Sequence, residues 1–131
     1  MPDTDLATAQ KATLSLLVVD DDQDIRDLMA DYLRQHGFQV RSADGGDAMF
    51  ACIEEEKPDL ILMDIRMPEM NGLDATRIIK EINHNTPVIA LSAYAFEENI
   101  QEAKAAGCDE FLAKPFRVED LIDLVRRYLK D

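Results

Sequence analysis

Carboxylate, hydroxyl and amine side chains directly follow four apolar stretches of this 131-residue chain. The stretches are residues 16–19, 60–63, 88–91 and 111–113, and the polar residues after them are Asp20-Asp21-Asp22, Asp64, Ser92 and Lys114. Each stretch has the length of a strand, and α/β sheets bind their ligands at the carboxyl ends of parallel strands. We therefore expect these polar side chains to gather at one edge of a sheet.

The three consecutive aspartates have two readings. Neighbouring carboxylates about 4 Å apart repel by ~1–4 kcal/mol per pair, a cost that a bound divalent cation removes, and Mg²⁺ favours carboxylate and phosphate oxygens. Alternatively, acidic residues at the start of a helix interact favourably with its dipole. We assign Asp20 and Asp21 to a metal site, and Asp22 and Asp24 to the start of the helix that follows.

Asp64, Ser92 and Lys114 suggest phosphoryl chemistry when they are taken together. A carboxylate can act as a nucleophile and form an aspartyl phosphate, while an amine and a hydroxyl neutralise phosphoryl oxygens. Alone, each residue has an ordinary explanation: a helix cap for Asp64, loop stabilisation for Ser92 and a solvated surface position for Lys114. Their common position at strand ends favours the phosphoryl site.

The pattern of the strands decides how the sheet is built. Residues 16–19, 60–63 and 88–91 are continuously apolar, as in strands buried on both faces, whereas Phe38-Gln39-Val40-Arg41 alternates and suits an edge. Gly37 ends the first helix, Asp44 is the expected N-cap of the second, and the fourth runs from about Phe96 to Ala106. Helical spacing predicts these buried faces for the first, third and last helices: Ile25, Leu28, Met29, Tyr32 and Leu33; Ala75, Ile78, Ile79 and Ile82; Leu121, Leu124, Val125 and Tyr128.

Five strands alternating with five helices predict a parallel α/β sheet with right-handed crossovers. A closed barrel would need about twice this length. We predict a flavodoxin-like (βα)5 three-layer sandwich with strand order 2-1-3-4-5. The switch point then lies between the first and third strands, where Asp20, Asp21 and Asp64 converge.

Composition restricts the function classes. The net charge of −13 argues against nucleic acid and against an anionic membrane surface. No apolar run has the ~20 residues of a membrane span, and the N-terminus lacks a signal-peptide core, so the cytosol is the expected compartment. We expect residues 1–14 to be a flexible segment and residues 15–131 to form one domain.

Four segments, LLVVDDD, LILMDIRMPEMNGL, TPVIALSA and FLAKPF, resemble the receiver domain of two-component response regulators in order and approximate spacing. The resemblance implies that Asp64 accepts a phosphoryl group from a phosphohistidine. It implies Mg²⁺ (or Mn²⁺ as a substitute) on Asp21, Asp64 and the backbone carbonyl of Arg66, with Asp20 acting through water. Lys114 would pair with the phosphoryl oxygens, and the Lys114–Pro115 peptide bond would be cis.

The resemblance also implies a conformational switch. Ser92 would move toward the phosphoryl group and free Phe111 to turn inward, changing the face formed by the fourth helix, fifth strand and fifth helix, where a downstream protein binds. From its position alone, Phe111 is read as core filling in preference to a switch residue. Arg66 and Tyr94 occupy positions that tune water access to the acyl phosphate in this family, and two bulky residues there predict slow hydrolysis.

The expected partners are a sensor histidine kinase or a histidine-phosphotransfer protein, docking near Ile25, Leu28 and Met29. The stretch from Thr76 to Phe116 looks most like receivers of hybrid kinases and phosphorelays. Such a receiver catalyses only its own phosphorylation and dephosphorylation. No helix-turn-helix pattern follows Tyr128, so we expect no DNA-binding output in this chain.

Two other functions fit the predicted fold. A flavin-binding module needs a glycine- and hydroxyl-rich loop after the first strand, where this chain has three aspartates. A Mg²⁺-dependent phosphatase with an aspartate nucleophile shares the chemistry, but it needs a second acid and a cap over the site. Turnover of small phosphate esters would distinguish the phosphatase from the receiver.

Overall fold

A computed structural model describes residues 14–67 and 70–129 of the chain. Five strands form one sheet: β1 (Ser15–Val19), β2 (Gln39–Ala43), β3 (Leu60–Asp64), β6 (Val88–Ser92) and β7 (Glu110–Ala113). Their order is β2-β1-β3-β6-β7, and every neighbouring pair is parallel. Counting the strands of this sheet alone, the predicted order 2-1-3-4-5 is confirmed.

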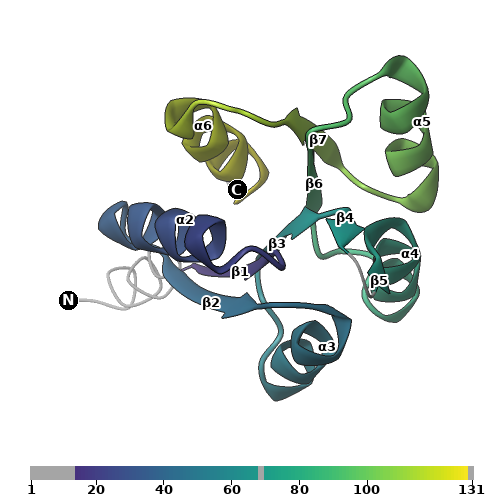
Figure 1. Cartoon of the computed structure of the whole chain (residues 1–131). Helices are drawn as coiled ribbons and strands as arrows, with labels where there is room; N and C mark the ends of the chain where they lie inside the picture. The colour runs from purple at the N-terminus through teal and green to yellow at the C-terminus, as the bar shows by residue number, and fades with distance from the viewer. Residues whose placement is uncertain (1–13, 68–69, 130–131) are drawn as a thin grey trace.

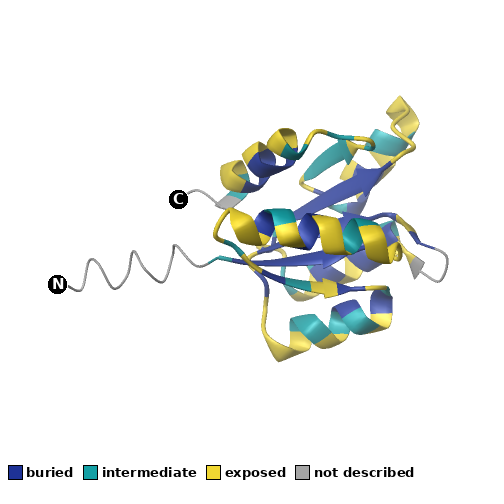
Figure 2. Ribbon diagram, turned by 60° about the vertical axis from the view of Figure 1, so that its left-hand side comes forward, coloured by how far each residue is buried: buried dark blue, intermediate teal, exposed yellow. Residues whose placement is uncertain are grey.

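Five helices cover the sheet from both sides (Figure 1). Helices α2 (Gln23–Gln35) and α6 (Val118–Leu129) pack on one face, and α3 (Gly46–Glu55), α4 (Gly72–Ile82) and α5 (Glu97–Ala106) pack on the other. Alternate residues of β1 serve the two layers, because Leu16 and Val18 point toward α2 and α6 while Leu17 and Val19 point toward the other three helices. Figure 2 shows the buried strands between helices whose outer faces are exposed.

The continuously apolar strands lie where they were expected. All residues of β1, β3 and β6 are buried, whereas the edge strand β2 is only partly buried: Val40 packs into the core on one face of the sheet and Ala43 into the core on the other. Leu14 already joins this sheet, since its carbonyl accepts a hydrogen bond from the Gln39 N–H at 2.9 Å. The rest of the N-terminal segment predicted to be flexible lies outside the described residues.

The structure also contains a small antiparallel pair that was not predicted. It comprises β4 (Arg66–Met67) and β5 (Met70–Asn71) and begins two residues after Asp64. Two-residue strands are too short to carry a periodic pattern, which is why the sequence did not indicate them.

Three local predictions are wrong. Leu28, predicted on the buried face of α2, is 67% exposed, and the buried residues of this helix are Met29, Ala30 and Leu33. Asp44 does not cap α3, because the helix begins at Gly46 with Gly45 as the N-cap, one residue later than an Asp44 cap requires. On α4, Ile78 and Ile82 are exposed, and the buried residues are Gly72, Ala75, Thr76 and Ile79. The rotation of α4 follows from its start, where Gly72 lies against the backbone of Ile65. Among the described residues, no helix is both long and apolar enough to cross a membrane.

Candidate functional site

Three carboxylates meet at the carboxyl edge of the sheet. Asp20 and Asp21 follow β1, and Asp64 ends β3, the strand paired with β1 in parallel register. One carboxylate oxygen from each of the three lies within 4.8 Å of the others. Asp20 is fully buried and Asp64 is 8% exposed, while Asp21 faces solvent. The strand ends therefore bring together the residues that the sequence predicted.

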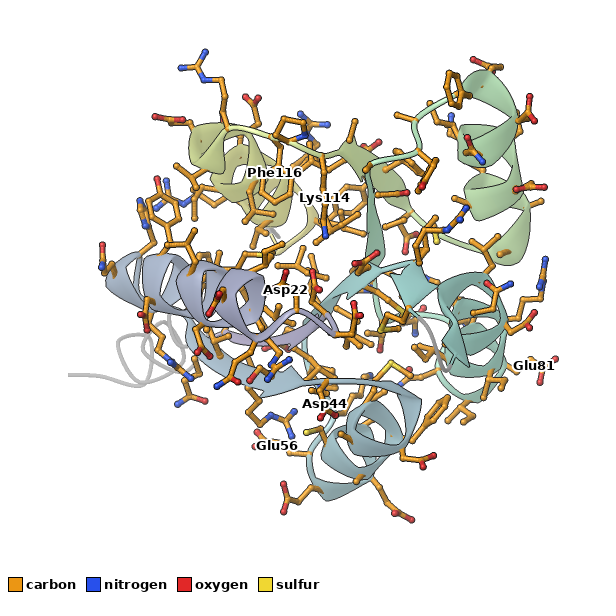
Figure 3. The ribbon with its side chains drawn as sticks, in the orientation of Figure 1. Asp22, Asp44, Glu56, Glu81, Lys114 and Phe116 are labelled. Carbon is orange, nitrogen blue, oxygen red and sulfur yellow. The ribbon has the colours of Figure 1, made fainter. Side chains whose placement is uncertain are left out.

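Lys114 bridges two of these acids from the opposite side. Its ammonium group donates to Asp20 Oδ2 at 3.1 Å and to Asp64 Oδ2 at 3.2 Å. The Lys114 main-chain N–H donates to the Ser92 carbonyl at 2.8 Å, and the peptide bond to Pro115 is cis, as expected. In Figure 3, the Lys114 side chain points from the β7–α6 connection toward the acidic start of α2, where Asp22 is labelled.

Burial and charge act against each other at this site. Burial raises the pKa of Asp64, and the Asp20 charge adds to the effect, while the Arg66 N–H and the Lys114 ammonium oppose it without cancelling it. For Lys114, burial alone would lower the pKa, but the hydrogen bond to Asp20 and the charges of Asp64 and Asp20 outweigh burial and raise the pKa. The protonated amine is thus held in place by the two carboxylates.

The neighbouring aspartates divide as predicted. Asp22 caps α2, since its Oδ1 accepts hydrogen bonds from the main-chain N–H groups of Asp24 at 3.0 Å and Ile25 at 3.2 Å. Asp24 lies in the first turn, where a negative charge is favourable. Asp22 is therefore occupied with the helix, and the metal-compatible cluster comprises Asp20, Asp21 and Asp64.

The donor atoms fit a small hard cation. Oxygen ligands from one or two carboxylates, with waters and phosphate oxygens, are what Mg²⁺ prefers. Both oxygens of Asp20 are engaged, Oδ1 by the Asp22 N–H at 2.9 Å and Oδ2 by Lys114. Asp64 is engaged in the same way, Oδ1 by the Arg66 N–H at 2.9 Å and Oδ2 by Lys114 at 3.2 Å, so these hydrogen bonds hold both buried carboxylates in fixed orientations.

Ser92 ends β6 beside Asp64, and Phe111 lies in β7. The Ser92 side chain is buried, and its hydroxyl oxygen accepts a hydrogen bond from the Tyr94 N–H at 3.0 Å, a local turn that also fits the loop-stabilising alternative. Phe111 is partly buried, pairs in register with Ala90 and packs against the core under α3, α4 and α5. Both the core-filling and the switch interpretation of Phe111 fit this position.

Arg66 and Tyr94 meet across an open cleft next to the acids. The Arg66 guanidinium carbon lies 4.2 Å from the centre of the Tyr94 ring, a cation–π contact. The cleft has a volume of about 770 Å³, and its lining also includes Asp21, Ser92 and Asn99. The two bulky side chains thus stand together at the mouth of the site, a contact that nothing in the sequence indicated.

An apolar groove of about 460 Å³ lies on the other side of Lys114. Ile25, Leu28 and Met29 of α2 form one wall, and Pro115 and Phe116 form the other. The α2 residues were predicted from the sequence as a docking surface, whereas Pro115 and Phe116 were not predicted to line it. The apolar pair directly after the site lysine was the available signal, because it must lie on the same edge of the sheet.

The chain is similar to known proteins in both sequence and structure. A family model described as "Response regulator receiver domain" matches residues 16–126. Sporulation initiation phosphotransferase F of Bacillus subtilis is 35% identical over 114 residues, which cover 87% of this chain and 92% of that protein. The polar-differentiation response regulator DivK of Brucella anthropi is 34% identical over 121 residues, covering 89% of this chain and 97% of DivK.

Solved structures give the same result. The chemotaxis protein CheY4 of Vibrio cholerae superimposes with a TM-score of 0.85 at 30% identity, covering 89% of this chain and 99% of that one. The receiver domain of the Francisella response regulator 1452 superimposes with a TM-score of 0.85 at 33% identity, covering 90% and 98%. The chain therefore belongs to the response regulator receiver domain family, the phospho-accepting modules of two-component signalling.

Proposed function

We propose that Asp64 is the residue that accepts the phosphoryl group, with a phosphohistidine as donor. The observation that carries this proposal is the convergence of Asp20, Asp21 and Asp64 around the Lys114 ammonium, which lies 3.1–3.2 Å from two of the three carboxylates. Asp64 is the acid at the end of the central strand. Its Oδ1 accepts the Arg66 N–H at 2.9 Å, which fixes the orientation of the carboxylate.

Asp21, Asp64 and the backbone carbonyl of Arg66 would hold the Mg²⁺ ion, with Asp20 reaching it through water. Mg²⁺ (or Mn²⁺) supplies charge neutralisation for the transferred phosphoryl oxygens when bound. The family membership and the oxygen-only donor set support this assignment.

In the transfer step, an Asp64 carboxylate oxygen forms a bond to phosphorus as the bond from phosphorus to the imidazole nitrogen breaks. The electron pair of the broken bond goes to that nitrogen. Lys114 neutralises charge on the phosphoryl oxygens, and Ser92 donates a hydrogen bond to one of them. A receiver of this kind catalyses only its own phosphorylation and dephosphorylation.

The apolar groove beside Lys114 is the proposed docking site for the donor. Its exposed edge is Leu28, which is 67% exposed although it lies on the apolar side of α2. A helix of a sensor histidine kinase or a histidine-phosphotransfer protein fits such a groove, because apolar side chains on one helical face fill it. The similarity to a protein named a sporulation initiation phosphotransferase favours a phosphorelay.

Output is proposed to occur at the face formed by α5, β7 and α6. When Ser92 moves toward the phosphoryl group, it vacates space at the end of β6, and Phe111 turns inward from β7. This is a shift between two populations of one fold, biased by the added charge.

We propose further that Arg66 and Tyr94 shield the acyl phosphate from water. An Arg66→Ala, Tyr94→Ala double variant should then lose its phosphoryl group several-fold faster, and unchanged loss would contradict the shielding.

The proposal is tested by incubating the protein with acetyl phosphate and Mg²⁺ and measuring its intact mass. One added phosphoryl group is expected on the wild type and none on Asp64→Asn. Equal labelling of both proteins would contradict the assignment.

We place the receiver at residues 15–131 and in the cytosol, where a soluble phosphodonor protein can reach it. The acidic loop after β1 gives no support to a flavin site.

A further inference from the structure

Two turns with the same hydrogen-bond pattern begin at Asp64 and at Ser92. In Asp64-Ile65-Arg66, the main-chain N–H of the third residue donates to the carboxylate of the first at 2.9 Å. In Ser92-Ala93-Tyr94, the main-chain N–H of the third residue donates to the hydroxyl oxygen of the first at 3.0 Å. The turns follow β3 and β6, adjacent parallel strands, so they lie side by side.

The third residues of the two turns contact each other. The Arg66 guanidinium lies over the Tyr94 ring, 4.2 Å from its centre. The two turns and this contact therefore form a continuous series of interactions from the Asp64 carboxylate to the Ser92 hydroxyl. Arg66 is exposed and Tyr94 is about half exposed, so neither side chain is needed to fill the core. Packing of the core therefore does not explain why these two side chains are in contact.

We propose that the Arg66–Tyr94 contact is a bridge that holds the Ser92 hydroxyl in its resting turn and so sets how readily the site switches. The proposal rests on the function proposed above and concerns its regulation. When Ser92 turns toward a phosphoryl group on Asp64, the hydrogen bond from the Tyr94 N–H weakens, and the Tyr94 main chain is released. The bridge opposes that release from the far side of the cleft. Arg66 and Tyr94 are thus positioning residues for Ser92, a role separate from shielding the acyl phosphate.

The first test reads the resting turn directly. Hydrogen exchange at the Tyr94 amide, followed by nuclear magnetic resonance, should become about two- to five-fold faster in Arg66→Leu, the factor expected for loss of an exposed cation–π contact. Arg77→Leu, a change to another exposed arginine on the neighbouring helix α4, should leave that amide unchanged. An Arg66→Leu exchange rate equal to wild type would overturn the bridge.

The second test reads the coupling to Ser92. Fluoroberyllate, which has the shape and charge of a phosphoryl group, is titrated into the protein at saturating Mg²⁺ by calorimetry. Tyr94→Leu keeps bulk but lacks a strong π face, so it should bind fluoroberyllate about two- to five-fold more tightly than wild type. Tyr94→Phe keeps the ring and should restore the wild-type affinity.

The effect of Tyr94→Leu must also vanish in a Ser92→Ala background, because the hydroxyl that the bridge restrains is gone. An equal change in both backgrounds, or a Tyr94→Phe variant that behaves like Tyr94→Leu, would overturn the proposal. Failure of the proposed function would be visible separately, as no acetyl phosphate adduct on the wild type. Failure of the bridge would show as unchanged Tyr94 exchange in a protein that is phosphorylated normally.

Discussion

At the scale of single residues, three identical side chains in a row have three environments. Asp20 is buried with both carboxylate oxygens engaged, Asp21 is exposed beside Asp64, and Asp22 caps α2. Residue type alone therefore does not assign their roles. The end of β1 and the start of α2 do, because they fix which side chain points to the site and which to the helix.

This division predicts different responses to Mg²⁺. Wild-type protein and Asp22→Asn should both gain stability, by about 2.7 kcal/mol when the free ion is at 100 times its dissociation constant. Asparagine caps a helix about as well as aspartate, so Asp22→Asn serves as a matched control that removes one charge. Asp21→Asn should lose most of the gain. Thermal unfolding with and without Mg²⁺ measures this, and equal gains in the two variants would contradict the assignment.

The raised pKa of Asp64 predicts a pH effect in metal-free protein. A folded-state pKa above the ordinary 3.8 means that the folded chain binds this proton more tightly than the unfolded chain does. The ionised carboxylate is therefore destabilising, fully so above the folded-state pKa and not at all below 3.8. Asp64→Asn should be more stable than wild type at pH 7, because asparagine removes the charge whose burial raises the pKa of Asp64.

The difference between the two proteins should shrink as the pH falls toward 3.8. Urea unfolding at a series of pH values, without divalent ions, measures it. A wild-type protein that is the more stable of the two at pH 7 would show that the Lys114 and Arg66 interactions outweigh burial.

At the scale of elements, the loop after Asp64 is set by its contact with α4. The Gly72 N–H donates to the Ile65 carbonyl at 3.2 Å, and a Cβ on Gly72 would lie 2.5 Å from the Ile65 Cα. Only glycine allows α4 to begin this close to the site. The same contact turns Ile78 and Ile82 outward, a result that helical spacing alone could not indicate.

Gly72→Ala should therefore destabilise the protein by about 1–3 kcal/mol, the range for overpacking, although alanine favours helix. Gly45→Ala is the control for a Cβ added in open space, because nothing lies within 4 Å and the φ of 177° is ordinary extended backbone. Since Gly45 is the N-cap of α3, this change should cost only the preference of the cap for glycine over alanine. Denaturant unfolding of both variants checks the prediction. A loss in Gly45→Ala as large as in Gly72→Ala would show that the Ile65 contact is not the cause.

The groove on α2 predicts a selective loss of transfer from a protein donor. Leu28→Lys should slow transfer from a phosphorylated histidine-phosphotransfer domain by about tenfold or more, since a charge replaces an apolar contact at the interface. Labelling by acetyl phosphate, which needs no docking surface, should be unchanged. Ile82→Lys replaces an equally exposed residue, 70% against 67%, on a different helix and should affect neither reaction. Equal slowing by Leu28→Lys and Ile82→Lys would contradict the assignment of the groove as the docking site.

At the scale of the whole molecule, the part of the site that the sequence predicted is the part that sheet topology determines. Asp64 and Ser92 end strands, and Asp20 and Lys114 directly follow strands. Parallel strands place their carboxyl ends together whatever the loops do. The Arg66–Tyr94 contact, the Phe116 wall of the groove and the β4–β5 pair depend on where loops and exposed side chains settle. Those positions follow from tertiary packing, which the spacing of apolar residues along the sequence does not indicate.

Chemical trapping identifies the side chain that carries the phosphoryl group, which we assign to Asp64. Borohydride reduces an aspartyl phosphate to homoserine, which peptide mass spectrometry then locates in the chain. After treatment with acetyl phosphate and Mg²⁺, we expect homoserine at position 64 and unmodified aspartate at positions 20 and 21. Homoserine at Asp20 or Asp21, or a phosphorylated protein without homoserine at position 64, would contradict it.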